Sequence, residues 1–335
     1  MLTILNELPD GLLKTPSTDL HKILNGPTLI HVEGRRKEPL FLSILLHGNE
    51  TSGYIALQEL LKKYSHRELP RSLSVFIGNV EAAKHSKRHL PQQLDFNRIW
   101  SNGDTAEEKM TQQIVAEMKN RNVFASIDIH NNTGFNPHYA CVTHLDNRFF
   151  QLATLFSRTV IYFTKPSGTQ TSAFSPICPS VTVECGQPDQ PYGVEHSLNF
   201  IDGCLHLDHF PDGSVHSQDM ELFHTMAIIK VPKSIRFGFN GDEADVLFRD
   251  DLDHLNFRVL SPGTVLGEAK NGTIALEAWS ESGKEVGEKY FHMQNNSILI
   301  KQEVMPSMLT LDKEIIKQDC LCYFMERYDH HSQVS

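Results

Sequence analysis

The chain has 335 residues, with 31 lysines and arginines against 41 aspartates and glutamates, and its formal net charge is −10. Non-specific binding to nucleic acid or to anionic membranes needs clustered positive charge, so this composition argues against both partners. Hydrophobic residues make up 40% and charged residues 21% of the chain, which is typical of a globular protein rather than a disordered one. The length suits one large or two medium-sized domains.

The N-terminal segment and the cysteines bear on the cellular compartment. Glu7 and Asp10 lie where a signal peptide would have basic and then apolar residues. No stretch approaches the roughly 18 apolar residues that a membrane-spanning helix needs. The 6 cysteines are scattered and form no disulfide framework. We therefore expect reduced thiols and a cytoplasmic protein without a membrane partner.

Apolar runs of strand length alternate with helical patterns through roughly the first 225 residues, and this alternation predicts an α/β fold with helices flanking a sheet. The expected strands are 39–46, 73–79, 123–130 and 180–186, and the expected helices are 51–64, 106–118 and 148–158.

The pattern changes after about Lys230. Short apolar runs are separated there by turn signals at Gly241, Pro262-Gly263 and Asn271-Gly272, which favours a small β-rich domain. We predict a catalytic α/β domain over 1–228 and a β-rich domain over 229–335. The last residues, which include His330 and His331, are expected to form a frayed tail.

Two histidines and a glutamate follow strands of the predicted sheet. His47 and Glu50 come directly after strand 39–46, and His130 ends strand 123–130. Ligands of open α/β sheets bind at the carboxyl ends of strands, and catalytic zinc typically takes three nitrogen or oxygen ligands. Asp128 lies on the same side of its strand as His130 and could orient that imidazole. The alternative for His47 is a polar residue satisfied within the core.

Other polar residues suggest catalysis or anion binding. Glu184 ends an apolar strand, where it is either a general base or a charge that reaches solvent. Asn97 and Arg98 lie in a loop, and an arginine can hold a carboxylate with two hydrogen bonds. Arg88 belongs to a basic stretch that is either a solvated loop or a funnel for an acidic substrate.

Four motifs in this order resemble the succinylglutamate desuccinylase/aspartoacylase family, whose members are relatives of the zinc carboxypeptidases. The motifs are HGNE (47–50), DFNR (95–98), DIH (128–130) and VECG (183–186). The resemblance covers roughly residues 40–200 and extends more weakly to 255–266. It implies a zinc-carboxypeptidase-like mixed sheet flanked by helices, with the smaller C-terminal domain covering the mouth of the active site.

The resemblance also implies a metal site and a base. One Zn²⁺ per chain would be bound by His47, Glu50 and His130. Glu184 would accept a proton from the attacking water and then donate a proton to the leaving amine.

Further residues would bind the substrate. Asn97 and Arg98 would hold its α-carboxylate, and Arg88 would polarise the scissile carbonyl. Asn131, which follows the third ligand as in aspartoacylase, would contact the substrate, and Tyr290 would cap the pocket.

We therefore expect a zinc-dependent amidohydrolase that cleaves the amide bond of a small anionic N-acyl amino acid. The acyl group is left open, because near Phe174 the chain lacks the arginine that aspartoacylases use for an acidic side chain. The alternatives are a zinc carboxypeptidase acting on peptides and a catalytically inactive small-molecule-binding homologue. Assembly into a homo-oligomer is left open too.

Overall fold

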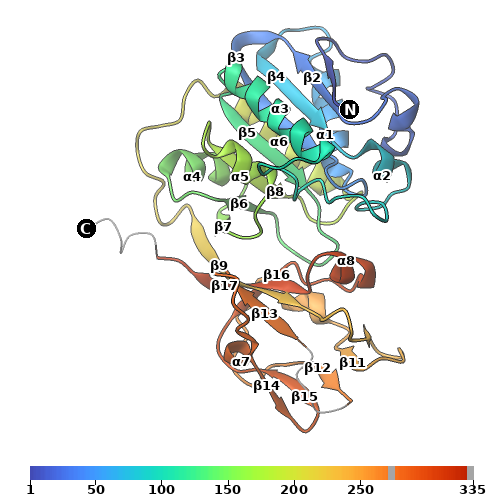
Figure 1. The fold of residues 1–335 in the computed structure, drawn as a ribbon. Helices are drawn as coiled ribbons and strands as arrows, with labels where there is room; N and C mark the ends of the chain where they lie inside the picture. The colour runs from blue at the N-terminus through green and yellow to red at the C-terminus, as the bar shows by residue number, and fades with distance from the viewer. Residues whose placement is uncertain (271–275, 330–335) are drawn as a thin grey trace. The chain divides into compact units, whose positions relative to one another are not determined.

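The computed structural model describes residues 1–270 and 276–329 (Figure 1). The expected turn at Asn271-Gly272 and the tail with His330 and His331 lie outside the described residues. The chain forms two compact units, and the segments of each unit are contiguous in space. The first unit contains Met1–Asn131 and His138–Glu221, and the second contains Asn132–Pro137 and Leu222–Ser335. The units thus divide after residue 221, whereas the sequence pattern places the domain boundary after 228.

A mixed sheet forms the centre of the first unit, with the strand order β1-β2-β4-β3-β5-β8-β6-β7. Neighbouring strands β4, β3, β5 and β8 run parallel, so their carboxyl ends meet at one edge. Strand β2 is antiparallel to β4, and β6 is antiparallel to β8. The mixed sheet expected from the sequence is therefore confirmed. Its strands are β1 Thr3–Leu5, β2 Thr28–Val32, β3 Gly34–Ile44, β4 Leu69–Ile77, β5 Ala125–His130, β6 Tyr139–Val142, β7 Thr159–Tyr162 and β8 Ser180–Glu184.

Helices cover both faces of this sheet (Figure 1). On one face, α1 lies against Ile44 and Ile129, and α6 packs beside α1. On the other face, α3 and α5 form a core with Phe41 and Phe76. Parallel strands covered on both faces become continuous apolar runs, which is why 39–46 and 123–130 are visible in the sequence. The helices are η1 Ser17–Lys22, α1 Ser52–Lys63, α2 Val80–Lys84, α3 Ala106–Asn120, α4 Asn147–Thr154, α5 Gln170–Phe174 and α6 Pro191–His206.

Local sequence signals explain some element boundaries and miss others. The start of α3 is fixed by a capping box. The Thr105 side chain accepts a hydrogen bond from the Glu108 N–H, and the Glu108 side chain accepts one from the Thr105 N–H. The expected strand at 39–46 begins earlier, at Gly34. Gly34 and Arg36 already pair with β4, and the register shifts between Arg36 and Leu40. Strands β6 and β7 are missing from the sequence prediction, because runs of four residues are too short to carry a clear periodic signal.

The second unit is rich in β-structure, as expected. Strand β9 pairs antiparallel with β13 and β17, and β17 pairs with β16. A separate sheet has the order β10-β11-β12-β15-β14. The turn residues Gly241 and Gly263 have φ values of 86° and 89°, which favour glycine. The elements are β9 Glu221–Lys230, β10 Phe237–Gly238, β11 Val246–Phe248, η2 Leu252–Leu255, β12 Val265–Ala269, β13 Glu277–Ser280, α7 Gly287–Tyr290, β14 Phe291–Gln294, β15 Ser297–Ile300, β16 Met305–Ser307, α8 Lys313–Gln318 and β17 Cys322–Arg327.

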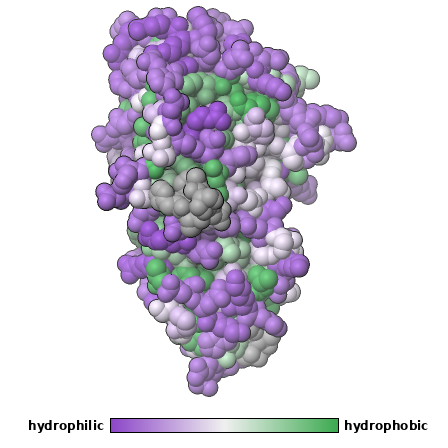
Figure 2. Space-filling view, turned by 90° about the vertical axis from the view of Figure 1, so that its left-hand side faces the viewer, coloured by the Kyte–Doolittle hydropathy of each residue, from purple (hydrophilic) through white to green (hydrophobic). Residues whose placement is uncertain are grey.

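The surface and the helices bear on membrane association. Hydrophilic residues cover most of the face seen in Figure 2, with smaller groups of apolar residues between them. Among the described residues, none of the helices has the length and apolar character needed to cross a membrane.

Candidate metal centre

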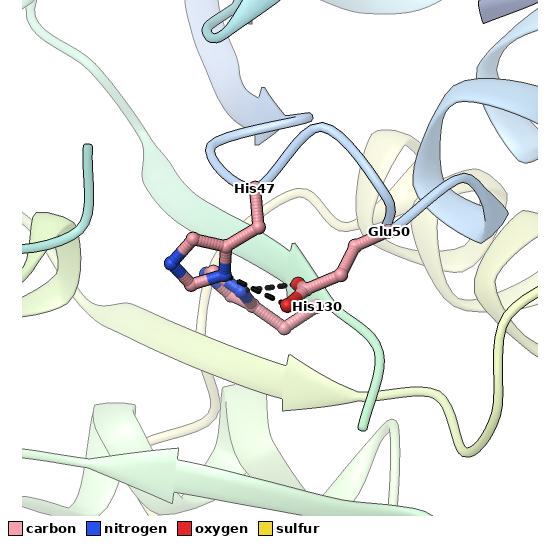
Figure 3. Close-up of side chains that lie close together, drawn as sticks. All are labelled: His47, Glu50 and His130. Atoms are coloured by element: carbon pink, nitrogen blue, oxygen red, sulfur yellow. Dashed lines mark hydrogen bonds and ion pairs between the residues drawn. The ribbon is translucent and has the colours of Figure 1, made fainter. Parts of the chain in front are cut away.

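The three residues that the sequence suggests as metal ligands come together at the carboxyl edge of the first unit's sheet (Figure 3). His47 and Glu50 lie in the loop between β3 and α1, and His130 is the last residue of β5. Glu50 Oε1 lies 2.7 Å from His47 Nδ1, and Glu50 Oε2 lies 2.7 Å from His130 Nδ1. One ligand atom from each residue lies within 4.8 Å of the others, and all three residues are buried.

A second carboxylate contacts each imidazole on its other nitrogen. Asp95 Oδ1 lies 3.0 Å from His47 Nε2, and Asp128 Oδ2 lies 2.8 Å from His130 Nε2. Because a carboxylate accepts a hydrogen bond, Nε2 of each histidine is the donor. In a neutral imidazole, Nδ1 then carries the lone pair, which points toward the centre of the group. The expectation that Asp128 orients His130 is confirmed.

The donor set suits zinc. Two imidazole nitrogens and one glutamate oxygen form one of the ligand combinations of catalytic zinc sites, and carboxylates behind the histidines are the usual outer contacts. In addition, Glu50, Asp95 and Asp128 bring three carboxylates to two buried imidazoles. A bound divalent cation would balance this excess of negative charge. These residues therefore fit the metal that the sequence motifs imply.

The pKa values in the group follow from the opposing charges. Burial alone lowers the pKa of His130, but Asp128 and Glu50 raise it well above its usual value. For His47, burial and the charge of Arg88 lower the pKa, and Glu50 and Asp95 outweigh them and raise it. Burial would raise the pKa of Glu50, yet the two histidines hold it below its usual range. The site therefore favours positive charge between its carboxylates.

The backbone of the loop after β3 explains the glycine in HGNE. Leu45 has φ of 52°, an uncommon conformation that turns the chain out of the strand. A Cβ atom on Gly48 would lie 2.1 Å from the backbone nitrogen of Ala83 in α2. The Gly48 N–H also donates to the Arg88 carbonyl oxygen at 3.2 Å. Only glycine permits this close approach, which places His47 and Glu50.

Arg88 lies beside the candidate ligands. Its Nη2 donates to Asp95 Oδ2 at 3.0 Å, and its Nη1 lies 3.8 Å from Glu50 Oε1. The side chain is buried, although the sequence also allows a solvated loop at this position. Its polarisation of a substrate carbonyl stays a prediction.

Asn97 and Arg98 reach the same region from the loop before α3. Asn97 Nδ2 lies 3.1 Å from His130 Nε2, and Asn97 Oδ1 accepts a hydrogen bond from the Gln170 N–H at 3.0 Å. Arg98 is half-buried, and its Nη1 donates to the Asn97 carbonyl at 2.8 Å. The pair therefore lies at the metal group, while binding of a substrate carboxylate stays a prediction.

Asn131 makes several contacts with the protein itself. Its backbone N–H donates to Glu50 Oε2 at 3.1 Å, and its side-chain Nδ2 donates to Ser52 Oγ and to the Gly186 carbonyl, each at 2.9 Å. Its Oδ1 accepts from the Ser52 N–H at 3.2 Å. The structure thus shows Asn131 tying the Glu50 loop to the loop after β8, and a substrate contact stays a prediction.

Glu184 is buried at the end of β8 and lies opposite His130 in the parallel register of β5 and β8. Its other neighbouring strand is β6, where Tyr139 is its register partner. The sequence leaves open whether this charge reaches solvent, and the burial excludes that alternative.

Tyr290 lies apart from these residues in the sequence and belongs to the second unit. It is buried in the hydrophobic core of that unit, with its ring centroid 5.4 Å from that of Phe324. Its role as a cap over a substrate stays a prediction.

Two further residues of the site escape the sequence analysis. Asp95 holds both His47 and Arg88, and its position two residues before Asn97 in DFNR is the signal that could have identified it. Gln170 orients Asn97 through its backbone and donates to Ser126 Oγ at 2.6 Å. No motif marks Gln170, since its contact depends on how α5 packs on the sheet.

Comparison with known proteins relates this geometry to a family. Residues 38–207 match the family model described as the succinylglutamate desuccinylase/aspartoacylase catalytic domain. A succinylglutamate desuccinylase of Pseudomonas aeruginosa is 25% identical over 285 residues, which cover 78% of this chain and 83% of that protein.

Solved structures share the fold. The succinylglutamate desuccinylase of Chromobacterium violaceum aligns with a TM-score of 0.58 and 14% identity over 88% of this chain and 86% of that chain. Murine aminoacylase 3 aligns with a TM-score of 0.55 and 15% identity over 88% of this chain and 96% of that chain. The matched family model spans half of the sequence and contains every candidate metal ligand. The chain belongs to the succinylglutamate desuccinylase/aspartoacylase family.

Proposed function

We propose that the chain is a zinc-dependent hydrolase that cleaves the amide bond of a small N-acyl amino acid. The observation that carries this proposal is the buried group of His47, Glu50 and His130, with Glu184 in register beside His130. Membership of the family supports the reaction class, because the related proteins are named as succinylglutamate desuccinylase and aminoacylase. The identity of the acyl group is left open.

The metal and Glu184 would have different roles in the reaction. Bound zinc supplies a Lewis acid and lowers the pKa of water toward about 7. Glu184 accepts a proton from the attacking water and delivers it to the nitrogen of the leaving amine. A carboxylate held on a strand is suited to both transfers, because it stays in place while the proton moves.

Arg88 provides fixed positive charge where the carbonyl oxygen becomes negative. Its guanidinium is held by Asp95 and lies close to Glu50, so its position is set before a substrate binds. Preorganised charge of this kind stabilises a transition state without reorganisation during the reaction.

Asn97 and Arg98 hold the α-carboxylate of the substrate, with Asn131 as a further substrate contact. Arg98 is half-buried, and its backbone neighbour Asn97 is anchored to α5. A carboxylate matches this planar donor. The preferred substrate is accordingly a small anion, even though the protein carries a net negative charge.

A panel of substrates tests the proposal. The zinc-loaded protein is incubated with succinyl-glutamate, acetyl-aspartate, neutral N-acyl amino acids and short peptides, and release of free amine is measured. We expect release from at least one N-acyl amino acid and none from the peptides. Release from peptides alone would support a carboxypeptidase. Purified protein without stoichiometric zinc and without turnover would support a small-molecule-binding homologue.

A further inference from the structure

A cavity lies at the edge of the same sheet opposite to the metal centre. It has a volume of about 560 Å³ and lies against the residues that precede β5 and β8, including Phe124 and Pro179. His130 and Glu184 are at the other ends of these two strands, so this cavity is separate from the metal centre. Its volume is within the range of small-molecule sites, roughly 300 to 1,000 Å³.

A buried arginine lines this cavity and directs its hydrogen bonds at carbonyl oxygens. Arg71, on β4, is 2% exposed, and its Nη1 and Nη2 donate to the carbonyl oxygens of Glu38 and Leu207, each at 2.8 Å. Its guanidinium also lies 3.7 Å from the ring centroid of Phe124. Within the part of the chain that the structure describes, its Nε has no hydrogen-bond partner. Buried charges in proteins are normally paired, so an unbalanced guanidinium at a cavity wall suggests an anion.

The other arginines around the cavity have carboxylate partners. Arg36 and Arg148 line it together with the carboxylates of Glu38 and Asp208. Arg36 pairs with Asp208, which is mostly exposed, and Arg148 Nε lies 3.3 Å from Asp146. Arg36 and Arg148 thus each have a carboxylate beside them, whereas the Nη atoms of Arg71 donate to carbonyl oxygens. Burial, and then the nearby charge of Arg36, lower the pKa of Arg71, and the charge of Glu38 opposes them only in part.

One wall of the cavity is apolar. The rings of Phe124 and Phe210 are stacked with centroids 5.0 Å apart, and Ile177, Cys178 and Pro179 also line the space. We propose that this cavity binds a small organic anion, whose carboxylate or phosphate meets Arg71 and Arg36 and whose carbon skeleton packs against the aromatic wall. An arginine fork recognises both anionic groups, and the apolar wall favours an organic ligand over an inorganic ion.

Calorimetric titration of the zinc-loaded full chain tests this proposal. Benzoate is the probe, benzamide is the neutral control of the same shape, and inorganic phosphate tests whether an anion without a carbon skeleton suffices. We expect benzoate to bind, benzamide not to bind, and phosphate to bind more weakly than benzoate. Phosphate binding as tight as benzoate binding would overturn the role of the aromatic wall.

Variants locate the binding. Arg71→Gln should weaken benzoate binding roughly tenfold or more, because a hydrogen bond to a charged group is lost. Arg98→Gln, at the metal centre, should leave benzoate binding unchanged. The proposal fails if neither anion binds, or if Arg98→Gln abolishes binding while Arg71→Gln preserves it.

If Arg71→Gln does not fold, a variant of the partly exposed Arg36 can be tested instead. Arg36 has a side chain that is 33% exposed, and Arg36→Gln should weaken benzoate binding severalfold. A crystal grown with 4-bromobenzoate gives an independent answer. Its bromine should be found by anomalous scattering beside Phe124 and Phe210, and bromine found only at the metal centre would overturn the proposal.

Discussion

His130 and Glu184 lie directly opposite each other on two parallel strands, β5 and β8. One is a candidate metal ligand and the other a candidate base. Neighbouring strands lie about 4.8 Å apart, and backbone hydrogen bonds fix that spacing. The two groups are therefore placed by the sheet itself, which is more rigid than a loop. This relationship leads to the first prediction.

Replacement of Glu184 by Gln should abolish turnover and leave zinc bound. Glutamine keeps the size of the side chain but cannot accept the proton, and general base catalysis typically contributes about 10² to 10⁴ in rate. Amine release and zinc content are measured on the same preparation. Glu195→Gln, on the exposed surface of α6, is the matched control and should keep full activity. Full activity in the Glu184 variant would remove this residue from the mechanism.

Replacement of Asp95 by Asn should weaken zinc binding about 10- to 100-fold, because Asp95 orients His47 and holds Arg88. Competition with a chelator measures this affinity. Asp104→Asn is the control, since the Asp104 side chain is fully exposed. An unchanged zinc affinity in the Asp95 variant would show that the contact with His47 does not support the metal.

The two arginines should differ in their kinetic effects. Arg98→Gln should raise KM with a smaller change in kcat, because a carboxylate contact is made in both the ground state and the transition state. Arg88→Gln should lower kcat, because its charge acts mainly on the developing oxyanion. Steady-state kinetics with the best substrate of the panel separates the two effects. The same change of KM in both variants would argue against separate roles.

Replacement of Gly48 by Ala should destabilise the fold by about 1 to 3 kcal/mol, because the new Cβ would overlap the backbone of Ala83. The free energy of unfolding in urea measures this effect. Gly203→Ala is the control, since Gly203 lies within α6 and its Cβ would have nothing within 4 Å. That control should be more stable than the parent by up to about 1 kcal/mol. Equal stability of both variants would contradict the close approach at Gly48.

The stability of the α1–α6 contact should depend on pH through Asp202. Partial burial raises the pKa of Asp202, but its hydrogen bonds with Lys63 Nζ and Tyr64 OH, at 2.8 and 2.7 Å, lower it overall. A carboxylate with a lowered folded pKa stabilises the protein above its unfolded pKa, about 3.9, and loses this effect as the pH falls through the folded value.

Asp202→Asn should therefore be less stable than the parent at pH 7, by less than about 1 kcal/mol, and the difference should shrink below pH 4. Urea unfolding at both pH values measures it. A difference of the same size at pH 7 and pH 3 would show that the ionised carboxylate contributes nothing.

The sequence determined the fold class and the candidate metal ligands, because both depend on local patterns. The runs at 39–46 and 123–130 are apolar because they are buried on both faces of the sheet. The ends of these runs in the sequence identify His47 and His130 as candidates. The capping box of Thr105 and Glu108 likewise fixes a helix start within four residues.

Only the tertiary structure decided which residues surround those ligands. Asp95 contacts His47 across 48 positions of the chain, and Gln170 contacts Asn97 across 73. Such contacts depend on how loops and α5 pack onto the sheet, and no periodicity in the sequence encodes that packing. The same holds for Arg71, whose position on β4 gives no sign that its buried Nε lacks a hydrogen-bond partner among the described residues. Net charge and spacing are properties of the sequence, whereas the pairing of charges is set by the folded chain.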